Sequence, residues 1–270
     1  MSNATPAAYD TIGLGYADVR RADPRVGRPI AAALGPARTV LNVGAGAGSY
    51  EPTDRVVVAV DPSAEMIRQR PAGLGPAVQA VAEALPFPDG SFEAALASLT
   101  VHHWPDPRAG LAEVRRVTSG PVVVFTFDKA SHDHQWLTTE YLPEIGDLDP
   151  AHLPATEIAT ALGGGTVEAL PIPHDCTDGF LHAWWRRPAA YLEPAVRAGI
   201  SGIARLPESV VAPALARLAG DLGSGAWQER HADLLDRDAV DAGYRLVVSP
   251  GPGRERGGEP GGPGPSSDRV

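Results

Sequence analysis

A glycine-rich turn between two apolar runs is the part of this sequence best suited to chemistry. Residues 38–43 (RTVLNV) precede the turn 44–48 (GAGAG), and a second apolar run at 55–60 (RVVVAV) ends at Asp61. Glycines adopt positive φ readily and let a ligand lie close to the backbone. A carboxylate at the end of the second run suits two neighbouring hydroxyl groups of a ribose. These residues therefore predict a binding site for a ligand that contains a ribose.

The spacing of the glycines departs from the dinucleotide-binding pattern. That pattern is G-x-G-x-x-G or A, whereas Ser49 stands at its last position here and the spacing is G-x-G-x-G. A nicotinamide-dependent oxidoreductase shares the layout of strand, glycine turn, strand and acid, so it is the alternative from another enzyme class. The departure at Ser49 argues against it.

The elements that position this turn alternate between strands and helices. Short apolar runs predict strands at 38–43, 55–60, 77–82, 92–99, 121–127, 166–172 and 244–248. Helices are predicted at 14–22, 25–34, 63–70 and 109–117. Alternation of this kind predicts βαβ units and a mostly parallel sheet with helices on both faces. Before the last strand we expect a helical insertion over 180–240, broken by Pro188, Pro194, Pro207 and Pro213.

Composition predicts a globular body with frequent turns and a short disordered end. The 270 residues include 30 Gly and 27 Pro, and 12 of these lie in 250–270, which we expect to be a disordered tail. At 43% hydrophobic residues, the rest of the chain can bury a sizeable core.

Charge and cysteine content argue against several classes of protein. The net charge is −10 and there is no dense basic run, so no nucleic-acid partner is expected. Lys129 is the only lysine among the 23 Lys and Arg residues. The single Cys176 allows no internal disulfide and suggests no zinc site. Without a secretion signal or an apolar run near 18 residues, the expected location is cytoplasmic, with no membrane partner.

Four segments, in this order, resemble the class I S-adenosylmethionine-dependent methyltransferases. The likeness is strongest to the small-molecule branch that includes the ubiquinone and menaquinone methyltransferases. The segments are VLNVGAGAGSY (40–50), VVAVDPSAEMIRQR (57–70), AEALPFPDGSFEAAL (82–96) and LTVHHWPD (99–106). The resemblance implies a Rossmann-like α/β fold with a seven-stranded, mostly parallel sheet. It also implies S-adenosylmethionine as cofactor and methyl transfer to an O, N or C nucleophile of a small-molecule acceptor.

The resemblance implies a set of cofactor-binding residues. The glycines would line the methionine part, Asp61 would bind the ribose hydroxyls and Met66 would pack on the adenine. Residues 82–83 would lie at the adenine edge, Leu99 near the sulfonium, and Tyr16 in a segment that closes over the pocket. The full expected set is Tyr16, Asn42, Gly44, Ala45, Gly46, Gly48, Asp61, Pro62, Met66, Ala82, Glu83 and Leu99.

Two positions depart from the family pattern. Asn42 stands where the family usually has Asp, and Val81 stands where it often has an acid that contacts the adenine amine. An amide lacks the charge that favours the ammonium group of the cofactor, and Val81 leaves that contact to Glu83 or the backbone. A protein that binds the cofactor without catalysis is therefore a further alternative.

His103 is the candidate catalytic residue, as a base at the mouth of the site, and the alternative is that His102 and His103 only form local structure. Methyl transfer from a sulfonium depends mainly on orientation in a dry site. A general base is needed only if the acceptor must lose a proton.

Three other clusters carry weaker signals. His132 and His134 lie near acids, but no third firm ligand is evident, and no metal is expected. The segment 174–178 (HDCTD) could line an acceptor pocket, whereas a Cys–His nucleophile is disfavoured. The aromatic residues Trp184, Trp185 and Tyr191 are expected in the core, with a substrate wall as the alternative. Arg186 and Arg187 are expected on a solvated face, with contact to an acidic acceptor as the alternative.

The expected organisation is one methyltransferase domain over 1–249. It has an N-terminal cap at 1–37, a cofactor-binding core at 38–128 and acceptor-side elements at 129–249. The sequence carries no signature of the acceptor's identity or of the oligomeric state.

Overall fold

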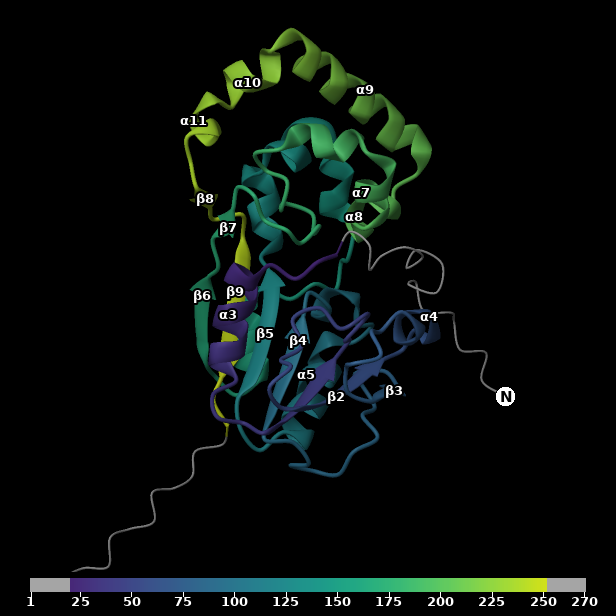
Figure 1. Cartoon of the computed structure of the whole chain (residues 1–270), viewed down its shortest axis with the longest axis vertical. Helices are drawn as coiled ribbons and strands as arrows, with labels where there is room; N and C mark the ends of the chain where they lie inside the picture. The colour runs from purple at the N-terminus through teal and green to yellow at the C-terminus, as the bar shows by residue number, and fades with distance from the viewer. Residues whose placement is uncertain (1–19, 252–270) are drawn as a thin grey trace, which may run out of the picture.

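A single sheet of seven strands organises residues 20–251, which are the residues that the computed structural model describes (Figure 1). The strand order is β3-β2-β1-β4-β5-β9-β6. Pairing is parallel from β3 to β5, and β9 is antiparallel to both β5 and β6. The predicted Rossmann-like, mostly parallel α/β fold is therefore confirmed. The bounds are β1 Thr39–Val43, β2 Val56–Asp61, β3 Ala77–Gln79, β4 Ala94–Ser98, β5 Val122–Phe127, β6 Thr166–Ala169 and β9 Tyr244–Ser249.

The central strands are apolar throughout because helices cover both of their faces. Successive side chains of a strand point to opposite faces, so Val123 and Phe125 of β5 join one core cluster while Val122 and Val124 join the other. Continuous apolar runs are typical of parallel strands buried on both sides. This explains why 38–43, 55–60 and 121–127 could be predicted as strands without any alternation of polarity.

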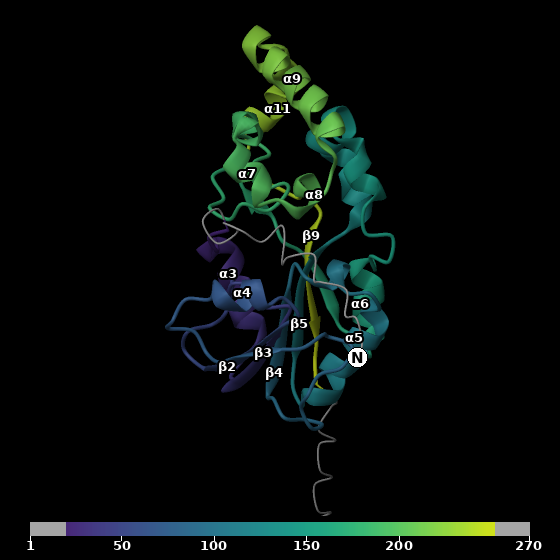
Figure 2. The same ribbon diagram turned by 90° about the vertical axis from the view of Figure 1, so that its right-hand side faces the viewer.

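Helices flank the sheet, with α3 and α4 on one side and α5 and α6 on the other (Figure 2). Val26 and Ile30 of α3 pack in one cluster, and Leu111 and Val114 of α5 in the other. The helices are α3 Pro24–Ala33, α4 Ala64–Arg68, α5 Pro107–Val117, α6 Ala155–Ala161, α7 Pro194–Ala198, α8 Ser201–Ala204, α9 Glu208–Ser224, α10 Ala226–Arg230 and α11 Ala232–Leu235. The 3-10 turns are η1 Val101–His103, η2 Lys129–His134, η4 Pro143–Asp147 and η5 Pro188–Leu192, and η3 Leu137–Tyr141 is π-helical.

A helical layer lies beyond the end of the sheet, with α9, α10 and α11 arching over it in Figure 1. It has its own core, which includes Trp136, Tyr191, Leu218 and Trp227. The short strands β7 Ile172–Pro173 and β8 Ala239–Val240 pair with each other, the first before η5 and the second after α11 in the chain. The predicted helical insertion before the last strand is therefore present.

Three of the four prolines in the insertion lie at the starts of helices, and the fourth lies inside a helix. Pro188 and Pro194 are the first residues of η5 and α7, and Pro207 is the N-cap of α9. Proline is well tolerated at a helix start because the N–H that it lacks has no partner there. Pro213 lies inside α9 without ending it, so the prediction of a break at that position was wrong.

Two further expectations need correction or lie outside the described residues. Residues 180–187 form turns rather than helix. Residues 20–22 were predicted to end a helix, but Arg20 forms an isolated antiparallel bridge with Asp178. Tyr16, most of the N-terminal cap and residues 252–270 of the tail lie outside the described residues.

Among residues 20–251, no helix combines the length and the apolar character that crossing a membrane requires.

Candidate functional site

The turn after β1 is shaped by glycines with positive φ, and Gly44 has no room for a side chain. Gly44 has φ +66° and Gly46 φ +53°. A Cβ on Gly44 would lie 1.8 Å from Thr100 Oγ1, and one on Gly46 would lie 3.2 Å from Met66 Cε. The N–H groups of Gly44 and Ala45 donate to the carbonyl of Val60 at 2.8 and 3.0 Å. The turn therefore packs closely against Val60 in β2, Met66 in α4 and Thr100 after β4.

Asp61 is the last residue of β2, and its carboxylate ties the glycine turn to α4. Its Oδ2 accepts a hydrogen bond from Gly46 N at 2.8 Å, and its Oδ1 accepts one from Ser63 N at 2.9 Å. Ser63 in turn caps α4, because its Oγ accepts from Met66 N at 3.2 Å. The side chain of Asp61 is thus held in one orientation by backbone donors on both sides.

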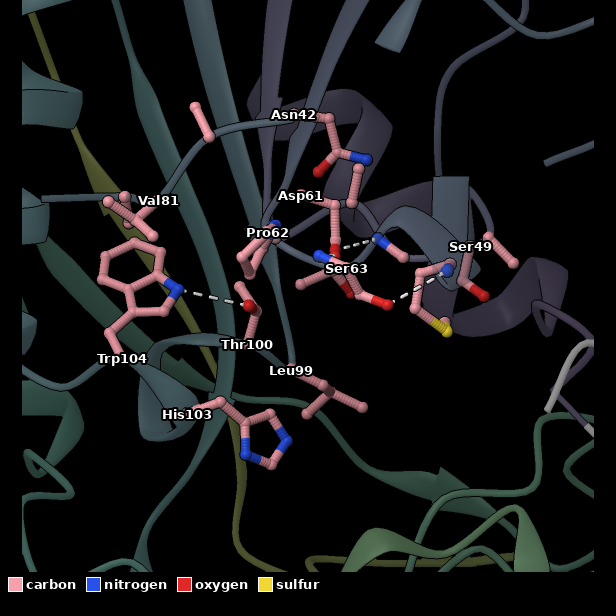
Figure 3. Close-up of a pocket in the computed structure, with 18 of the residues that line it drawn as sticks. Asn42, Ser49, Asp61, Pro62, Ser63, Val81, Leu99, Thr100, His103 and Trp104 are labelled. Atoms are coloured by element: carbon pink, nitrogen blue, oxygen red, sulfur yellow. Dashed lines mark hydrogen bonds between the residues drawn. The ribbon is translucent and has the colours of Figure 1, made fainter. Parts of the chain in front are cut away.

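These segments enclose a cavity at the carboxyl ends of β1 to β4, which we call the first cavity (Figure 3). It encloses about 900 Å³, including the part open to solvent. Ligands of α/β proteins bind at this edge of the sheet. Its lining comprises Arg20, Asn42, Gly44, Ala45, Gly46, Ala47, Ser49, Asp61, Pro62, Ser63, Met66, Ala80, Val81, Ala82, Glu83, Ser98, Leu99, Thr100, His103, Trp104 and Pro105.

The structure brings most of the predicted residues together in this lining. Two members of the predicted set do not appear there. Tyr16 lies outside the described residues, and Gly48 lies on the other side of the turn, where a Cβ would meet Leu74 Cδ1 at 2.2 Å. The others are Asn42, Gly44, Ala45, Gly46, Asp61, Pro62, Met66, Ala82, Glu83 and Leu99, together with His103.

Sequence reasoning missed Trp104 and Arg20 as lining residues. Trp104 Nε1 donates to Thr100 Oγ1 at 3.2 Å, which fixes the indole in the wall (Figure 3). Trp104 stands in the LTVHHWPD segment, so its aromatic side chain beside the histidines was an available signal. Arg20 reaches the site through tertiary contacts alone, and no sequence signal marks it.

At the adenine edge that the resemblance implies, Glu83 is engaged in a hydrogen bond and Val81 presents an apolar surface. Glu83 Oε1 accepts a hydrogen bond from Asp106 N at 3.1 Å, at the start of α5. Val81 lines the cavity and is 45% exposed, which is unusual for a large apolar side chain. An exposed apolar side chain beside a cavity can be covered by a flat apolar ring.

Asn42 belongs to a buried polar network rather than standing alone. Its Nδ2 donates to Glu51 Oε1 at 2.9 Å, and Glu51 receives two hydrogen bonds from Arg70, at 2.7 and 2.9 Å. The side chains of Arg70 and Glu51 are only 5% and 1% exposed. An amide at position 42 is needed as a donor here, because an aspartate would face the carboxylate of Glu51. The sequence departure at Asn42 therefore has a structural partner.

We expect Arg70→Met to destabilise the fold by about 3 kcal/mol, because it leaves the buried Glu51 carboxylate without its counter-charge. The matched control is Arg68→Met, two residues earlier, at the last residue of α4. Arg68 pairs with Glu65 but is 70% exposed, so its loss should cost less than about 1 kcal/mol. Urea unfolding of the two variants measures the difference. Equal destabilisation by both would contradict the role of the buried pair.

A second cavity adjoins the first and lies between the strand ends and the helical layer. Its volume is about 640 Å³, including the part open to solvent, and it shares Arg20, Leu99 and His103 with the first cavity. Leu99 has φ +50°, a strained value for a bulky residue. The remaining lining is His102, Phe127, Lys129, Ile145, Leu148, Asp149, His152, Phe180, Leu181, Gly199, Ile200, Ser201, Gly202 and Tyr244. The junction at Leu99 and His103 is therefore a place where two ligands could meet.

The histidines of the second cavity are held neutral by their surroundings. Burial lowers the pKa of His103 to about 4, although the carboxylate of Asp149 acts in the opposite direction. Burial and the nearby His103 hold the pKa of His102 well below its usual value, and burial also lowers the pKa of His152. His152 Nε2 donates to the carbonyl of Phe127 at 2.8 Å, which leaves Nδ1 as a hydrogen-bond acceptor.

His102, His103 and Asp149 also bring three possible metal-ligand atoms within 4.8 Å of one another. Asp149, however, is paired with Arg205 at 2.7 Å. The guanidinium of Arg205 binds Oδ1 of this carboxylate, and its positive charge would repel a divalent cation at the same place. We therefore do not interpret this cluster as a metal centre. In the part of the chain that the structure describes, His134 belongs to no such cluster.

We expect the folded protein to lose stability as the pH falls from about 6.5 to about 4. The unfolded chain takes up protons on its histidines near pH 6.5, whereas folded His103 takes one up only near pH 4. Stability from this residue is thus present above pH 6.5 and is lost as the pH falls towards 4. Thermal unfolding of the wild type and of His103→Gln over this range checks the effect. An equally steep decline in the variant would contradict it.

The segment 174–178 anchors the chain and does not line either cavity. Asp178 is fully buried and accepts hydrogen bonds from Arg20 at 2.5 Å and from Tyr50 Oη at 2.7 Å. Burial raises the pKa of the Cys176 thiol to about 12, so the thiol is neutral. The prediction that this segment could line an acceptor pocket is not supported by its position. Asp178 affects the cavities only indirectly, because it binds Arg20, which lines both of them.

The aromatic residues of the helical layer pack in the core, as predicted. Trp185 and Tyr191 are 2% and 0% exposed, and Trp184 packs against the same clusters. The prediction of a solvated face was wrong for Arg187. Its guanidinium lies 4.2 Å from the ring centroid of Trp184 and donates to the carbonyl of Cys176 at 2.6 Å.

Comparison with known proteins agrees with this geometry. A family model described as a methyltransferase domain matches residues 41–123. An uncharacterized methyltransferase, YcgJ of Bacillus subtilis, is 34% identical over 126 residues, which cover 42% of this chain and 49% of that protein. The chain thus spans about half the length of this curated relative.

Two solved structures cover nearly the whole described fold. One comes from Anabaena variabilis and is provisionally assigned as a methyltransferase from an antibiotic biosynthesis pathway. It is 29% identical, covers 86% of this chain and 98% of its own, and has a TM-score of 0.80. The other is the [4+2]-cyclase SpnF, 16% identical, covering 90% and 94% with a TM-score of 0.51. The second likeness concerns the fold alone.

Proposed function

We propose that this chain, which belongs to the class I S-adenosylmethionine-dependent methyltransferase family, transfers a methyl group from S-adenosylmethionine to a small-molecule acceptor. The observation that carries the proposal is the pair of adjoining cavities. The first is built from the glycine turn and Asp61, and the second opens from it at Leu99 and His103. A cofactor cavity that meets an acceptor cavity at one point suits a direct transfer between two bound molecules.

The residues of the first cavity fit this cofactor. Gly44 and Gly46 line the first cavity without side chains of their own, so a ligand can lie against their backbone. Asp61 offers a fixed carboxylate to ribose hydroxyls. Met66 and the exposed face of Val81 offer apolar contact to adenine. When bound, S-adenosylmethionine supplies a methyl group that is activated by the positive charge of its sulfonium.

The side chains at the junction have separate roles in the proposed reaction. Leu99 and the apolar wall exclude water from the transfer path. His103 is neutral near pH 7, so its imidazole can accept a hydrogen bond from an acceptor O–H or N–H and orient that group. With a pKa of about 4, His103 is a weak base, and we assign it mainly to positioning.

Calorimetric titration with S-adenosylhomocysteine tests the cofactor assignment. We expect micromolar affinity for S-adenosylhomocysteine and none for NADH. Absence of S-adenosylhomocysteine binding at high micromolar concentration would contradict the proposal, and NADH binding would favour the oxidoreductase alternative.

Turnover is tested separately with methyl-labelled S-adenosylmethionine and a broad panel of acceptors. Cofactor binding without label transfer would support the non-catalytic alternative, or another reaction on this fold, as the name of the [4+2]-cyclase illustrates. The proposal has three further parts. The acceptor is a small molecule, the protein has no nucleic-acid or membrane partner, and it is located in the cytoplasm.

A further inference from the structure

The only lysine of the chain lines the second cavity. The chain has 23 Lys and Arg residues, and all of them except Lys129 are arginine. Lys129 belongs to the lining of this cavity. Its Nζ donates to the carbonyl of Leu148 at 2.7 Å, and the residue is half-buried. Among the residues whose side chains the structure describes, no carboxylate forms an ion pair with it. A half-buried ammonium group without a counter-charge favours an anion nearby.

The other charged side chains that line this cavity, Arg20 and Asp149, are each paired with an opposite charge. Arg20 is paired with Asp178 at 2.5 Å, and Asp149 is paired with Arg205 at 2.7 Å. Asp128, beside Lys129 in the sequence, is not part of the lining, and it shares Arg245 with Asp241, at 3.0 and 2.7 Å. The imidazoles of the wall are neutral near pH 7 and add no charge. The described wall therefore carries one uncompensated positive charge, that of Lys129.

The rest of the wall is apolar and rich in rings. Phe127 stacks on His152 with ring centroids 4.7 Å apart and an angle of 18°, and Phe180 lies 4.5 Å from Tyr244. Ile145, Leu148, Leu181 and Ile200 add aliphatic side chains to the wall. A ring-containing molecule can pack its faces against these aromatic and aliphatic side chains.

We propose that the second cavity selects a monoanionic acceptor with a ring-containing apolar body, whose carboxylate pairs with Lys129. The inference rests on the proposed function, which makes this cavity the acceptor site. Lys129 then determines specificity by charge, while the aromatic wall accommodates the ring. A neutral analogue of the same shape would leave the ammonium group unpaired in a dry site, which lowers its affinity.

The test compares matched acids and amides on the protein saturated with S-adenosylhomocysteine. The probes are benzoate and benzamide, 2-naphthoate and 2-naphthamide, and indole-3-acetate and indole-3-acetamide. For at least one pair we expect the acid to bind the wild type about tenfold more tightly than its amide. Lys129→Met should abolish this preference, and Lys129→Arg should keep most of it because the charge remains.

Two controls separate this inference from a general charge effect and from the proposed function. Arg38→Met removes a cation that is 87% exposed on the surface, and it should leave the preference for acids unchanged. Affinity for S-adenosylhomocysteine is measured first in every variant, and it should be the same in Lys129→Met as in the wild type.

Three outcomes would overturn the inference. One is that no acid binds better than its amide, including the case in which no probe binds. The second is a preference that survives in Lys129→Met. The third is tight binding of Zn²⁺ that displaces the acids, which would assign the cavity to a cation. If S-adenosylhomocysteine binds normally, these outcomes leave the proposed function intact, whereas its failure to bind would remove both proposals.

Discussion

Asp61→Ala is expected to weaken S-adenosylhomocysteine binding about 100-fold, because it removes the acceptor that we propose for two ribose hydroxyls. The same change also removes the links to Gly46 N and Ser63 N, which are 2.8 and 2.9 Å long. The glycine turn and the start of α4 would lose their common anchor. Calorimetric titration measures the affinity, and circular dichroism shows whether the fold persists.

Asp54→Ala is the matched control for this variant. Asp54 is an acid in the same region whose side chain is 70% exposed and pairs only with the neighbouring Arg55 at 2.9 Å. Its loss should change the cofactor affinity by less than about twofold. Asp61→Asn adds a graded comparison, since it keeps the shape and loses the charge. An Asp61→Ala variant that is folded and binds normally would remove Asp61 from the site.

Gly44→Ala is expected to destabilise the protein by about 3 kcal/mol and to abolish cofactor binding at accessible concentrations. The new Cβ would lie 1.8, 2.7 and 2.8 Å from three atoms of Thr100, so no rotation of that side chain relieves the overlap. A shift of Thr100 would also disturb Trp104, whose indole donates to Thr100 Oγ1. The turn and one wall of the first cavity would therefore move together.

Gly35→Ala separates backbone strain from the steric clash. Gly35 has φ +58°, close to the +66° of Gly44, but a Cβ there would meet nothing within 4 Å. It should cost only the strain of a left-handed alanine, about 1–2 kcal/mol, and leave cofactor affinity unchanged. Unfolding and titration of both variants give the comparison. If Gly44→Ala behaved like Gly35→Ala, close packing of the turn would not be what requires glycine at position 44.

Most of the first cavity could be predicted from the sequence because its residues are local to strand ends. The parallel strands were recognisable as apolar runs, and the carboxyl ends of such strands meet at one edge. Gly44, Gly46 and Asp61 follow β1 and β2 directly, so their proximity follows from the order of the elements. Gly48 shows the limit of this reasoning, because a turn has two sides and spacing does not say which one faces the ligand.

The contacts of Asn42 show a second limit. The sequence marked Asn42 as a departure from the family pattern, but only the fold places Glu51 and Arg70 against it. A buried charge requires a partner, yet the sequence does not show which of 22 arginines provides it. The exchange of Asp for Asn was therefore visible, whereas its compensation was not.

The sequence by itself determined the fold, the glycine turn, the acid at the end of β2 and the resemblance that implied the cofactor. The tertiary structure alone decided the second cavity. Its wall collects Arg20, Lys129, Asp149, Phe180 and Tyr244 from segments far apart in the chain. Local propensity specifies each of these segments separately, whereas packing of the helical layer on the sheet places them together. The sequence likewise does not show that Lys129 lacks a paired carboxylate in the described part of the chain, because the ion pairs of Arg20 and Asp149 join residues that are far apart in the chain.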